Sequence, residues 1–125
     1  MGGSDLVHII DDDDALRDSL SFLLSSVGIK TKSYETATGY SNDPERGACG
    51  CILTDVRMPG MSGIDLAQLI KQRKRSRHVP ILFLTAHSVN DEDVLRGYGV
   101  GAVDYLSKPV NTDQLLSLLR VWLYR

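Results

Sequence analysis

The stretch LVHIIDDDD at residues 6–14 joins a short, mostly apolar run to four consecutive aspartates. Such a run predicts a β-strand that is covered on both faces. A second run, CILT at residues 51–54, is followed in the same way by Asp55. Parallel strands that end in carboxylates can bring them to one edge of a sheet. Because like charges held together are costly unless a cation or a proton neutralises them, the pattern indicates a divalent-metal site.

Strand-like and helix-like segments alternate along the whole chain. Apolar runs predict strands, and apolar residues at helical spacing predict helices between them. The expected strands are 6–10, 29–34, 51–54, 81–85 and 102–106, and the expected helices are 16–27, 36–42, 64–70, 91–97 and 112–124. This alternation predicts an α/β fold, with a doubly wound five-stranded parallel sheet and helices on both faces.

Five polar side chains fall at or just past the ends of predicted strands: Asp11, Asp12, Asp55, Thr85 and Lys108. In an open parallel sheet, sites lie outside the carboxyl ends of the strands. Carboxylates suit Mg²⁺, which prefers oxygen ligands and keeps several waters. With the metal bound, Asp55 could attack phosphorus as a nucleophile, while Lys108 and Thr85 stabilise the phosphoryl oxygens.

Composition bounds the class of protein. The 125 residues fit one domain, and a formal charge of −2 argues against a strongly basic nucleic-acid binder. No apolar run approaches the roughly 20 residues that span a bilayer. Residues 1–4 resemble a cloning remnant, which leaves 5–125 as the domain. Cys49 and Cys51 are too close for an unstrained disulfide, so nothing requires an oxidising compartment and we expect a cytoplasmic protein.

Four motifs together carry a resemblance to a known family. They are IIDDD at 9–13, LTDVRMPGMSG at 53–63, FLTA at 83–86 and GAVDYLSKP at 101–109. From about residue 6 to 124 the chain resembles the receiver domains of bacterial two-component response regulators, including the chemotaxis regulators. The resemblance implies a flavodoxin-like fold with strand order 2-1-3-4-5, and a phosphorylation-dependent signalling switch rather than an enzyme with an external substrate.

The resemblance also implies an acceptor and its metal ligands. Asp55 would take a phosphoryl group from the phosphohistidine of a sensor histidine kinase or phosphotransfer domain, and the domain would catalyse both this transfer and its own dephosphorylation. Asp11, Asp12, Asp55 and the main-chain carbonyl of Arg57 would bind Mg²⁺ or Mn²⁺. Asp13 and Asp14 would be surface or helix-terminal charges.

The remaining implied roles concern the switch. Lys108 would pair with the phosphate, Thr85 would move its hydroxyl toward it, and Tyr105 would then swing inward. The Lys108–Pro109 bond would be cis, a form that proline adopts at low cost.

Partners follow from the same resemblance. The last helices and the fifth strand would face an output domain or a partner protein. The final helix is apolar over more than one stripe, which could also serve a phosphorylation-dependent homodimer. The basic run at 71–77 suits a solvated helix end, so we expect neither direct nucleic-acid contact nor membrane contact.

Three other hypotheses account for parts of the pattern. A phosphatase of the haloacid dehalogenase class also uses an aspartate nucleophile, Mg²⁺, a hydroxyl and a lysine, but Ala15 stands where that class has Thr or Val. A flavin-binding module would need phosphate donors in the first loop, which holds carboxylates instead. A constitutive adaptor would have no use for the complete acidic set.

Overall fold

Strands and helices alternate in the computed structural model, which describes residues 6–44, 50–74, 76–86, 99 and 104–123. The elements are β1 (Val7–Ile10), α1 (Asp14–Ser26), β2 (Thr31–Tyr34), α2 (Ala37–Ser41), β3 (Cys51–Asp55), α3 (Gly63–Gln72), β4 (Ile81–Thr85), β5 (Asp104–Ser107) and α5 (Thr112–Leu123). No helix among these residues is long and apolar enough to cross a bilayer.

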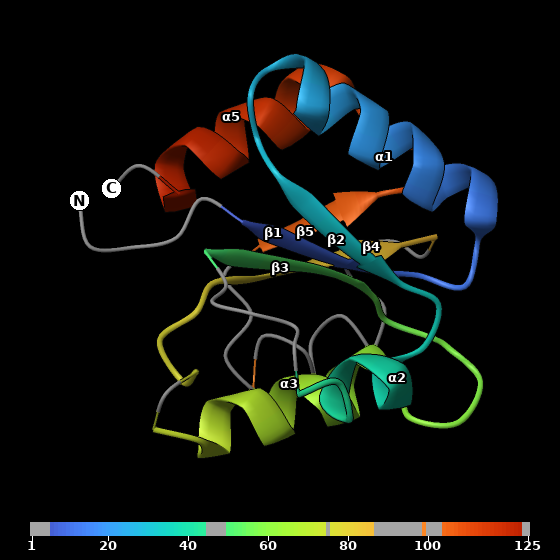
Figure 1. Cartoon of the computed structure of the whole chain (residues 1–125), viewed down its shortest axis with the longest axis vertical. Coiled ribbons are helices and arrows are strands. Elements are labelled where there is room, and N and C mark those ends of the chain that lie inside the picture. The colour runs from blue at the N-terminus through green and yellow to red at the C-terminus, as the bar shows by residue number, and fades with distance from the viewer. Residues whose placement is uncertain (1–5, 45–49, 75, 87–98, 100–103, 124–125) are drawn as a thin grey trace.

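The five strands form one parallel sheet in the order β2-β1-β3-β4-β5 (Figure 1). The order reverses at β1, where Val7 lies level with Thr31 of β2 on one side and with Cys51 of β3 on the other. α1 and α5 cover one face of the sheet, and α2 and α3 cover the other. The predicted doubly wound sheet and its strand order are therefore confirmed.

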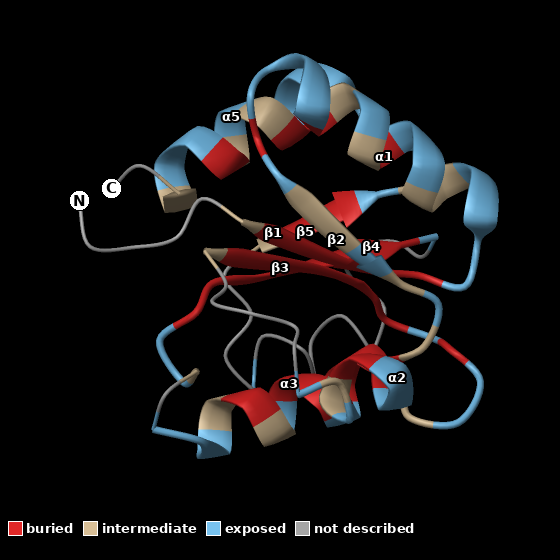
Figure 2. Cartoon of the chain, in the orientation of Figure 1, coloured by how far each residue is buried: buried red, intermediate tan, exposed pale blue. Residues whose placement is uncertain are grey.

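The core consists of two apolar clusters, one on each face of the sheet. Successive residues of β1 serve opposite clusters, since Ile9 packs with α1 and α5 while Ile10 packs with α2 and α3. β1, β3 and β4 are buried along their whole length, whereas the edge strand β2 is partly exposed (Figure 2). Truncating a fully buried side chain such as Phe83 to alanine typically costs about 3–5 kcal/mol.

The predicted second strand begins two residues later than the apolar pattern suggests. Gly28 follows α1 with a φ of +83°, and its amide bonds to the Ser25 carbonyl at 3.0 Å. The Ile29 amide then reaches back to the Leu24 carbonyl at 2.9 Å. With Gly28 in the left-handed conformation, the end of α1 holds Ile29 by a hydrogen bond. The Ile29 side chain is therefore buried because the helix ends there, and not because Ile29 belongs to a strand.

Other boundaries differ by one or two residues. β3 runs through Asp55, so that carboxylate belongs to the strand itself. α5 begins at Thr112 as predicted, and Asn111 Oδ1 accepts the Gln114 amide at 2.9 Å. The predicted helix at 91–97, residues 102–103 of the predicted last strand, residues 1–4 and Cys49 lie outside the described residues.

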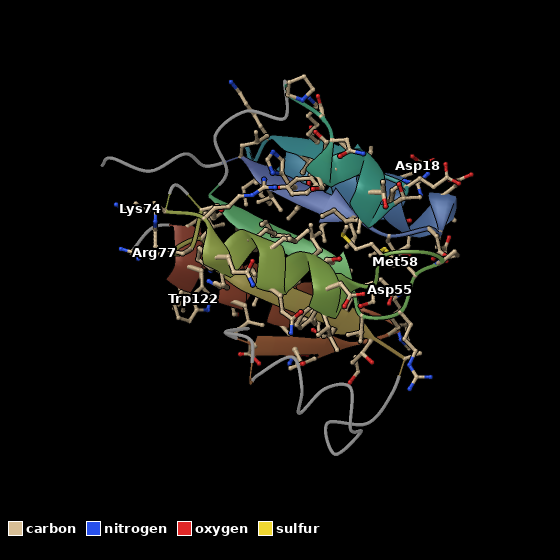
Figure 3. All side chains as sticks on the ribbon, turned by 90° about the horizontal axis from the view of Figure 1, so that it is seen from below. Asp18, Asp55, Met58, Lys74, Arg77 and Trp122 are labelled. Atoms are coloured by element: carbon tan, nitrogen blue, oxygen red, sulfur yellow. The ribbon has the colours of Figure 1, made fainter. Side chains whose placement is uncertain are left out.

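The two ends of the sheet carry opposite charge. Arg73, Lys74 and Arg77 are exposed where α3 ends, and Figure 3 shows Lys74 and Arg77 at the opposite end of the molecule from Asp55. The nearby Lys71 ammonium is partly buried and donates to the carbonyls of Arg77 and Val79, at 2.9 and 2.8 Å. Lys71 therefore helps to fold this turn, while its neighbours face the solvent.

Candidate functional site

The predicted site residues gather at the carboxyl edge of the sheet. Asp11 directly follows β1, Asp55 and Thr85 end β3 and β4, and Lys108 directly follows β5. β1 and β3 are neighbours at the point where the strand order reverses, which is where open parallel sheets form their crevices. The register of the sheet therefore brings together residues that are far apart in the sequence.

Lys108 joins the two strand-end carboxylates. Its ammonium lies 2.8 Å from Asp11 Oδ2 and 3.3 Å from Asp55 Oδ2. The Asp11 side chain is fully buried, while those of Asp55 and Lys108 are 12% and 24% exposed. A ligand from solvent can thus reach Asp55 more easily than Asp11.

Three carboxylates of this cluster could hold one cation. Asp11, Asp12 and Asp55 each offer an oxygen, and these oxygens all lie within 4.8 Å of one another. Asp11 Oδ2 is buried, and its close polar contact among the described residues is the Lys108 ammonium at 2.8 Å. Three carboxylates so close together exceed the charge of this one ammonium, and their oxygens are the donors that a hard divalent ion prefers.

The electrostatics of the cluster appear in two pKa shifts. Burial raises the pKa of the Asp55 carboxyl, the charge of Asp11 raises it further, and Lys108 opposes both. Burial alone would lower the pKa of the Lys108 ammonium, but its hydrogen bond to Asp11 and the two carboxylate charges outweigh burial and raise that pKa. One ammonium therefore does not fully compensate the aspartates around it.

The loop between β1 and α1 is held largely by side chains. The Asp13 amide donates to Asp11 Oδ1 at 2.9 Å, and Asp13 Oδ1 caps α1 by accepting the Leu16 amide at 3.1 Å. The Arg17 guanidinium bonds to the main-chain carbonyl of Asp11 and pairs with the Asp14 carboxylate. The predicted helix-terminal roles of Asp13 and Asp14 are confirmed, since Asp13 is the N-cap and Asp14 lies in the first turn.

The loop between β3 and α3 is held by close packing of the main chain. A Cβ on Gly63 would stand 2.0 Å from the Asp55 carbonyl oxygen and 3.3 Å from the Phe83 ring, so only glycine fits there. Ser62 and Asp65 form a capping box that starts α3. The Arg57 amide donates to Asp55 Oδ1 at 3.4 Å, which places Arg57 beside the Asp55 carboxylate.

Thr85 and Tyr105, the two predicted switch residues, are both buried. Thr85 is 1% exposed, and its carbonyl accepts the Lys108 amide at 2.7 Å. The Lys108–Pro109 bond is cis, as predicted. Tyr105 is 5% exposed, with its ring centroid 5.3 Å from that of Phe83, so its side chain already points inward in this structure.

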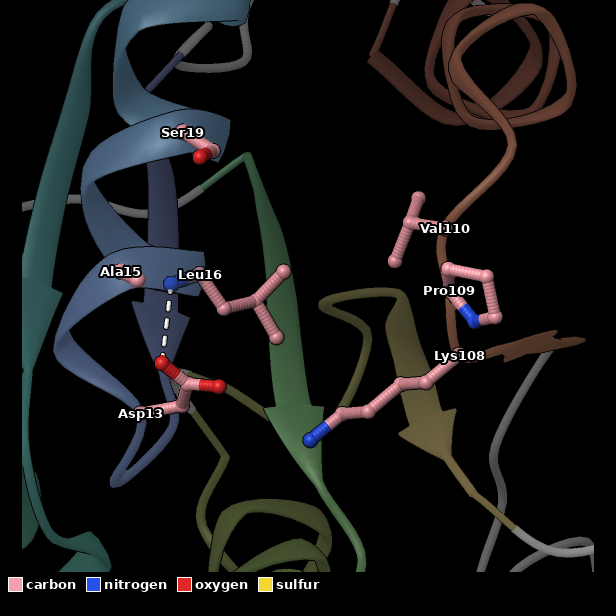
Figure 4. Close-up of a pocket in the computed structure, with 7 residues that line it drawn as sticks. All are labelled: Asp13, Ala15, Leu16, Ser19, Lys108, Pro109 and Val110. Atoms are coloured by element: carbon pink, nitrogen blue, oxygen red, sulfur yellow. Dashed lines mark hydrogen bonds between the residues drawn. The ribbon is translucent and has the colours of Figure 1, made fainter.

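A groove of about 510 Å³ opens beside the cluster (Figure 4). Its walls are the first turns of α1 and the segment after β5, and Lys108 extends between them. The lining residues are Asp13, Ala15, Leu16, Ser19, Lys108, Pro109 and Val110. The lining is mostly apolar, and it connects to Asp55 through Lys108, whose ammonium lies 3.3 Å from Asp55 Oδ2.

Two residues that support the site are not evident from the sequence as functional residues. Arg17 resembles an ordinary helix-surface residue, although its spacing of three from Asp14 signals an ion pair. Gly63 resembles a flexible loop residue, and no local signal reveals its contact with the Asp55 carbonyl.

The comparisons identify the family. A family model described as the response regulator receiver domain matches residues 7–120, which is nearly the whole chain. The chain belongs to this receiver-domain family. It therefore belongs among the regulatory phosphoacceptor domains of two-component systems, in which phosphorylation controls signalling.

Individual relatives agree with the family assignment. The response regulator protein TodT of Pseudomonas putida is 36% identical over 115 residues, covering 92% of this chain and 49% of TodT. The chemotaxis protein CheY4 of Vibrio cholerae superposes with a TM-score of 0.87 at 26% identity, covering 97% of this chain and all of CheY4. This receiver domain thus spans about half the length of the curated relatives it matches.

A third solved structure shares the fold. It is the receiver domain of a sensor histidine kinase from Pseudomonas aeruginosa, with a TM-score of 0.86 and 24% identity over 98% of this chain and all of that domain. That domain has a magnesium ion coordinated in its active-site cleft.

Proposed function

We propose that Asp55 is the phosphoryl acceptor of this domain, and that residues 5–125 form one phosphorylation-controlled switch. The observation that carries the proposal is the position of the Asp55 carboxylate. Its side chain is 12% exposed, lies 3.3 Å from the Lys108 ammonium, and shares a cluster with Asp11 and Asp12. Three carboxylates against one ammonium leave an excess of negative charge that a divalent cation would balance.

Mg²⁺ or Mn²⁺ suits that cluster. Asp11, Asp12, Asp55 and the main-chain carbonyl of Arg57 would hold the ion, and the close approach of the three carboxylates supports this. When bound, the ion supplies positive charge that reduces the repulsion between a carboxylate and an anionic phosphoryl group.

The transfer itself needs few groups. An oxygen of the Asp55 carboxylate would bond to phosphorus of a phosphohistidine, the phosphorus–nitrogen bond would break, and the imidazole would leave with that electron pair. Lys108 would pair with the phosphoryl oxygens, and Thr85 would donate its hydroxyl to them. The later hydrolysis of the aspartyl phosphate would proceed at the same groups.

The groove beside Asp55 suits the donor protein. A sensor histidine kinase or phosphotransfer domain must place its phosphohistidine within bonding distance of Asp55. The groove is lined mostly by apolar side chains, together with Lys108 and Asp13, so it offers both contact area and charge near the acceptor. We therefore assign the donor to the α1 side of the site.

The switch is electrostatic. A phosphoryl group adds a charge of about −1.5 to −2 and three acceptor oxygens. Inverting a population from 1:99 to 99:1 requires about 5.5 kcal/mol, which a few charge-assisted hydrogen bonds of about 1.5–3 kcal/mol each could supply. We propose that Thr85 moves toward the phosphoryl group and that its movement favours the inward position of Tyr105.

The output would involve the last helices and the fifth strand. Val121 of α5 is 57% exposed, although Leu115 and Leu119 on the same helix are fully buried. Since the chain spans about half of its curated relatives, we propose an attached output domain or a partner protein, with a phosphorylation-dependent homodimer as one form of output. A cytoplasmic location and the absence of direct nucleic-acid and membrane contact are part of the proposal.

Labelling tests the acceptor directly. We expect the protein to gain one phosphoryl mass when it is treated with acetyl phosphate and Mg²⁺, and borohydride trapping to locate the label at Asp55. Asp55→Asn should remove the label, whereas Asp18→Asn, a matched change on the exposed face of α1, should retain it. A persistent label on Asp55→Asn would overturn the assignment, and trapping at Asp11 would instead favour the dehalogenase-type chemistry.

A further inference from the structure

Arg17 contacts the loop that carries two of the three clustered carboxylates. Its Nη1 donates to the main-chain carbonyl of Asp11, and its Nη2 pairs with Asp14 Oδ1. The Arg17 side chain is only 15% exposed, while that of Asp14 is 81% exposed. The two terminal nitrogens of the guanidinium therefore bind different groups, one the main chain of the loop and the other a surface carboxylate.

The carbonyl that Arg17 holds needs a donor. Asp11 is fully buried, and it lies just past the end of β1. A buried carbonyl without a partner is costly, so the guanidinium fixes the main chain at the residue where the strand turns toward α1.

The position of Asp12 depends on that main chain. Its side chain is exposed, and none of the described residues donates a hydrogen bond to its carboxylate. Asp12 can therefore remain within 4.8 Å of the oxygens of Asp11 and Asp55 only if the main chain of the loop keeps its conformation. Four consecutive aspartates repel one another; Lys108 pairs with the Asp11 side chain, and among the described residues Arg17 is the cation that binds the main chain of this loop.

We propose that Arg17 is a positioning residue for cation binding, which acts by holding the Asp11 carbonyl and thereby keeping the Asp11 and Asp12 carboxylates in reach of one ion. The inference rests on the proposed function, in which that ion is Mg²⁺. Arg17 itself touches neither the ion nor the phosphoryl group. Its contact with Asp14 is secondary, because an exposed ion pair of this kind contributes little.

The direction in which the Mg²⁺ affinity of Arg17→Met changes distinguishes this positioning role from a simple effect of charge. Arg17→Met removes a positive charge near the cluster, which by electrostatics alone would strengthen cation binding. Loss of positioning would weaken it instead, by about 10-fold, as expected for residues that orient metal ligands. We expect isothermal titration with Mg²⁺ alone to show this weakening for Arg17→Met, and a smaller weakening for Arg17→Lys, which retains one donor.

Asp14→Asn is the matched control, because it breaks the Arg17–Asp14 pair but leaves the bond to the Asp11 carbonyl. Its Mg²⁺ affinity should remain within about 2-fold of the wild type, as for other exposed pairs. Wild-type or tighter Mg²⁺ binding by Arg17→Met would overturn the inference, as would an equal weakening in Asp14→Asn. If Arg17→Met does not fold, unchanged binding by Arg17→Lys would overturn it.

A kinetic measurement keeps the inference apart from the proposed function. With acetyl phosphate, Arg17→Met should need more Mg²⁺ to reach half of its maximal labelling rate, while the rate at saturating Mg²⁺ is preserved. A wild type that binds Mg²⁺ but is never labelled at Asp55 would contradict the proposed function alone. Equal Mg²⁺ affinities in wild type and Arg17→Met would contradict the role of Arg17 alone.

Discussion

The loops after β1 and after β3 present carboxylates to the same edge of the sheet, but they are supported in opposite ways. After β1, side chains do the holding, since Arg17 bonds to the Asp11 carbonyl and Asp11 Oδ1 accepts the Asp13 amide. After β3, the main chain packs so closely that a Cβ on Gly63 would stand 2.0 Å from the Asp55 carbonyl oxygen. The first loop should therefore fail when a side chain is lost, and the second when one is added.

The largest loss of stability should come from removing the Lys108 ammonium, which pairs with a carboxylate of each loop. Lys108→Met leaves the buried Asp11 carboxylate and the nearby Asp55 carboxylate without their common partner. Removing one partner of a buried ion pair typically costs about 3–5 kcal/mol, and the partial exposure of Lys108 favours the lower end. Urea unfolding should show this loss without metal, and added Mg²⁺ should recover part of it.

The pH dependence of wild-type stability tests the same contribution of Lys108 to the folded state. The pKa of Lys108 is raised in the folded state, so its stabilising effect is fully present below the ordinary lysine pKa and is lost as pH rises through the raised value. The stability difference between wild type and Lys108→Met should thus narrow only in alkaline solution. A difference that already narrows at neutral pH would contradict this account.

An intermediate effect should follow from Gly63→Ala. The added methyl group must displace the main chain at Asp55, and overpacking of this kind costs about 1–3 kcal/mol. Urea unfolding should show the loss, and labelling by acetyl phosphate should slow because Asp55 shifts. Gly60→Asn is the matched control in the same loop, since a Cβ there meets nothing within 4 Å and asparagine tolerates its φ of +77°. Equal losses in both variants would show that the loop is merely intolerant of side chains.

The smallest effect has the most informative sign. Because the pKa of Asp55 is raised, folding favours its protonated form, and that contribution is lost as pH rises through the raised pKa. Asp55→Asn should therefore be more stable than the wild type at neutral pH without metal, and this advantage should shrink in acid. Asp11→Asn should instead be destabilised, because it breaks the shorter contact to Lys108. Urea midpoints without metal that fall for both variants would refute this contrast.

The sequence predicted the sheet because its signals are local and redundant. Apolar runs of strand length, each followed by a carboxylate, hydroxyl or lysine, indicate both the parallel sheet and the edge where its site lies. Asp11, Asp55, Thr85 and Lys108 lie at strand ends as predicted. Their chemical roles remain proposals that the experiments above test.

The supports of the site were not predictable in the same way. Arg17 bonds to a main-chain carbonyl six residues earlier, and Gly63 is required by a contact that exists only after folding. His8 resembles a chance polar residue in an apolar run, yet its Nδ1 lies 2.9 Å from the buried Tyr40 hydroxyl. The inward position of Tyr105 is a choice between side-chain rotamers, which sequence patterns do not record.

The separation of charge between the two ends of the molecule has a consequence for how proteins encounter it. The net charge is only −2, but the carboxylate cluster lies at one end of the sheet, and Arg73, Lys74 and Arg77 are exposed at the other (Figure 3). This separation gives the molecule a dipole that runs across it, from the Lys74 and Arg77 side to the Asp55 side, which can rotate an incoming protein before contact and raise the fraction of productive collisions. Each phosphoryl transfer would strengthen that dipole, so the modified domain would also attract and orient its neighbours differently in solution.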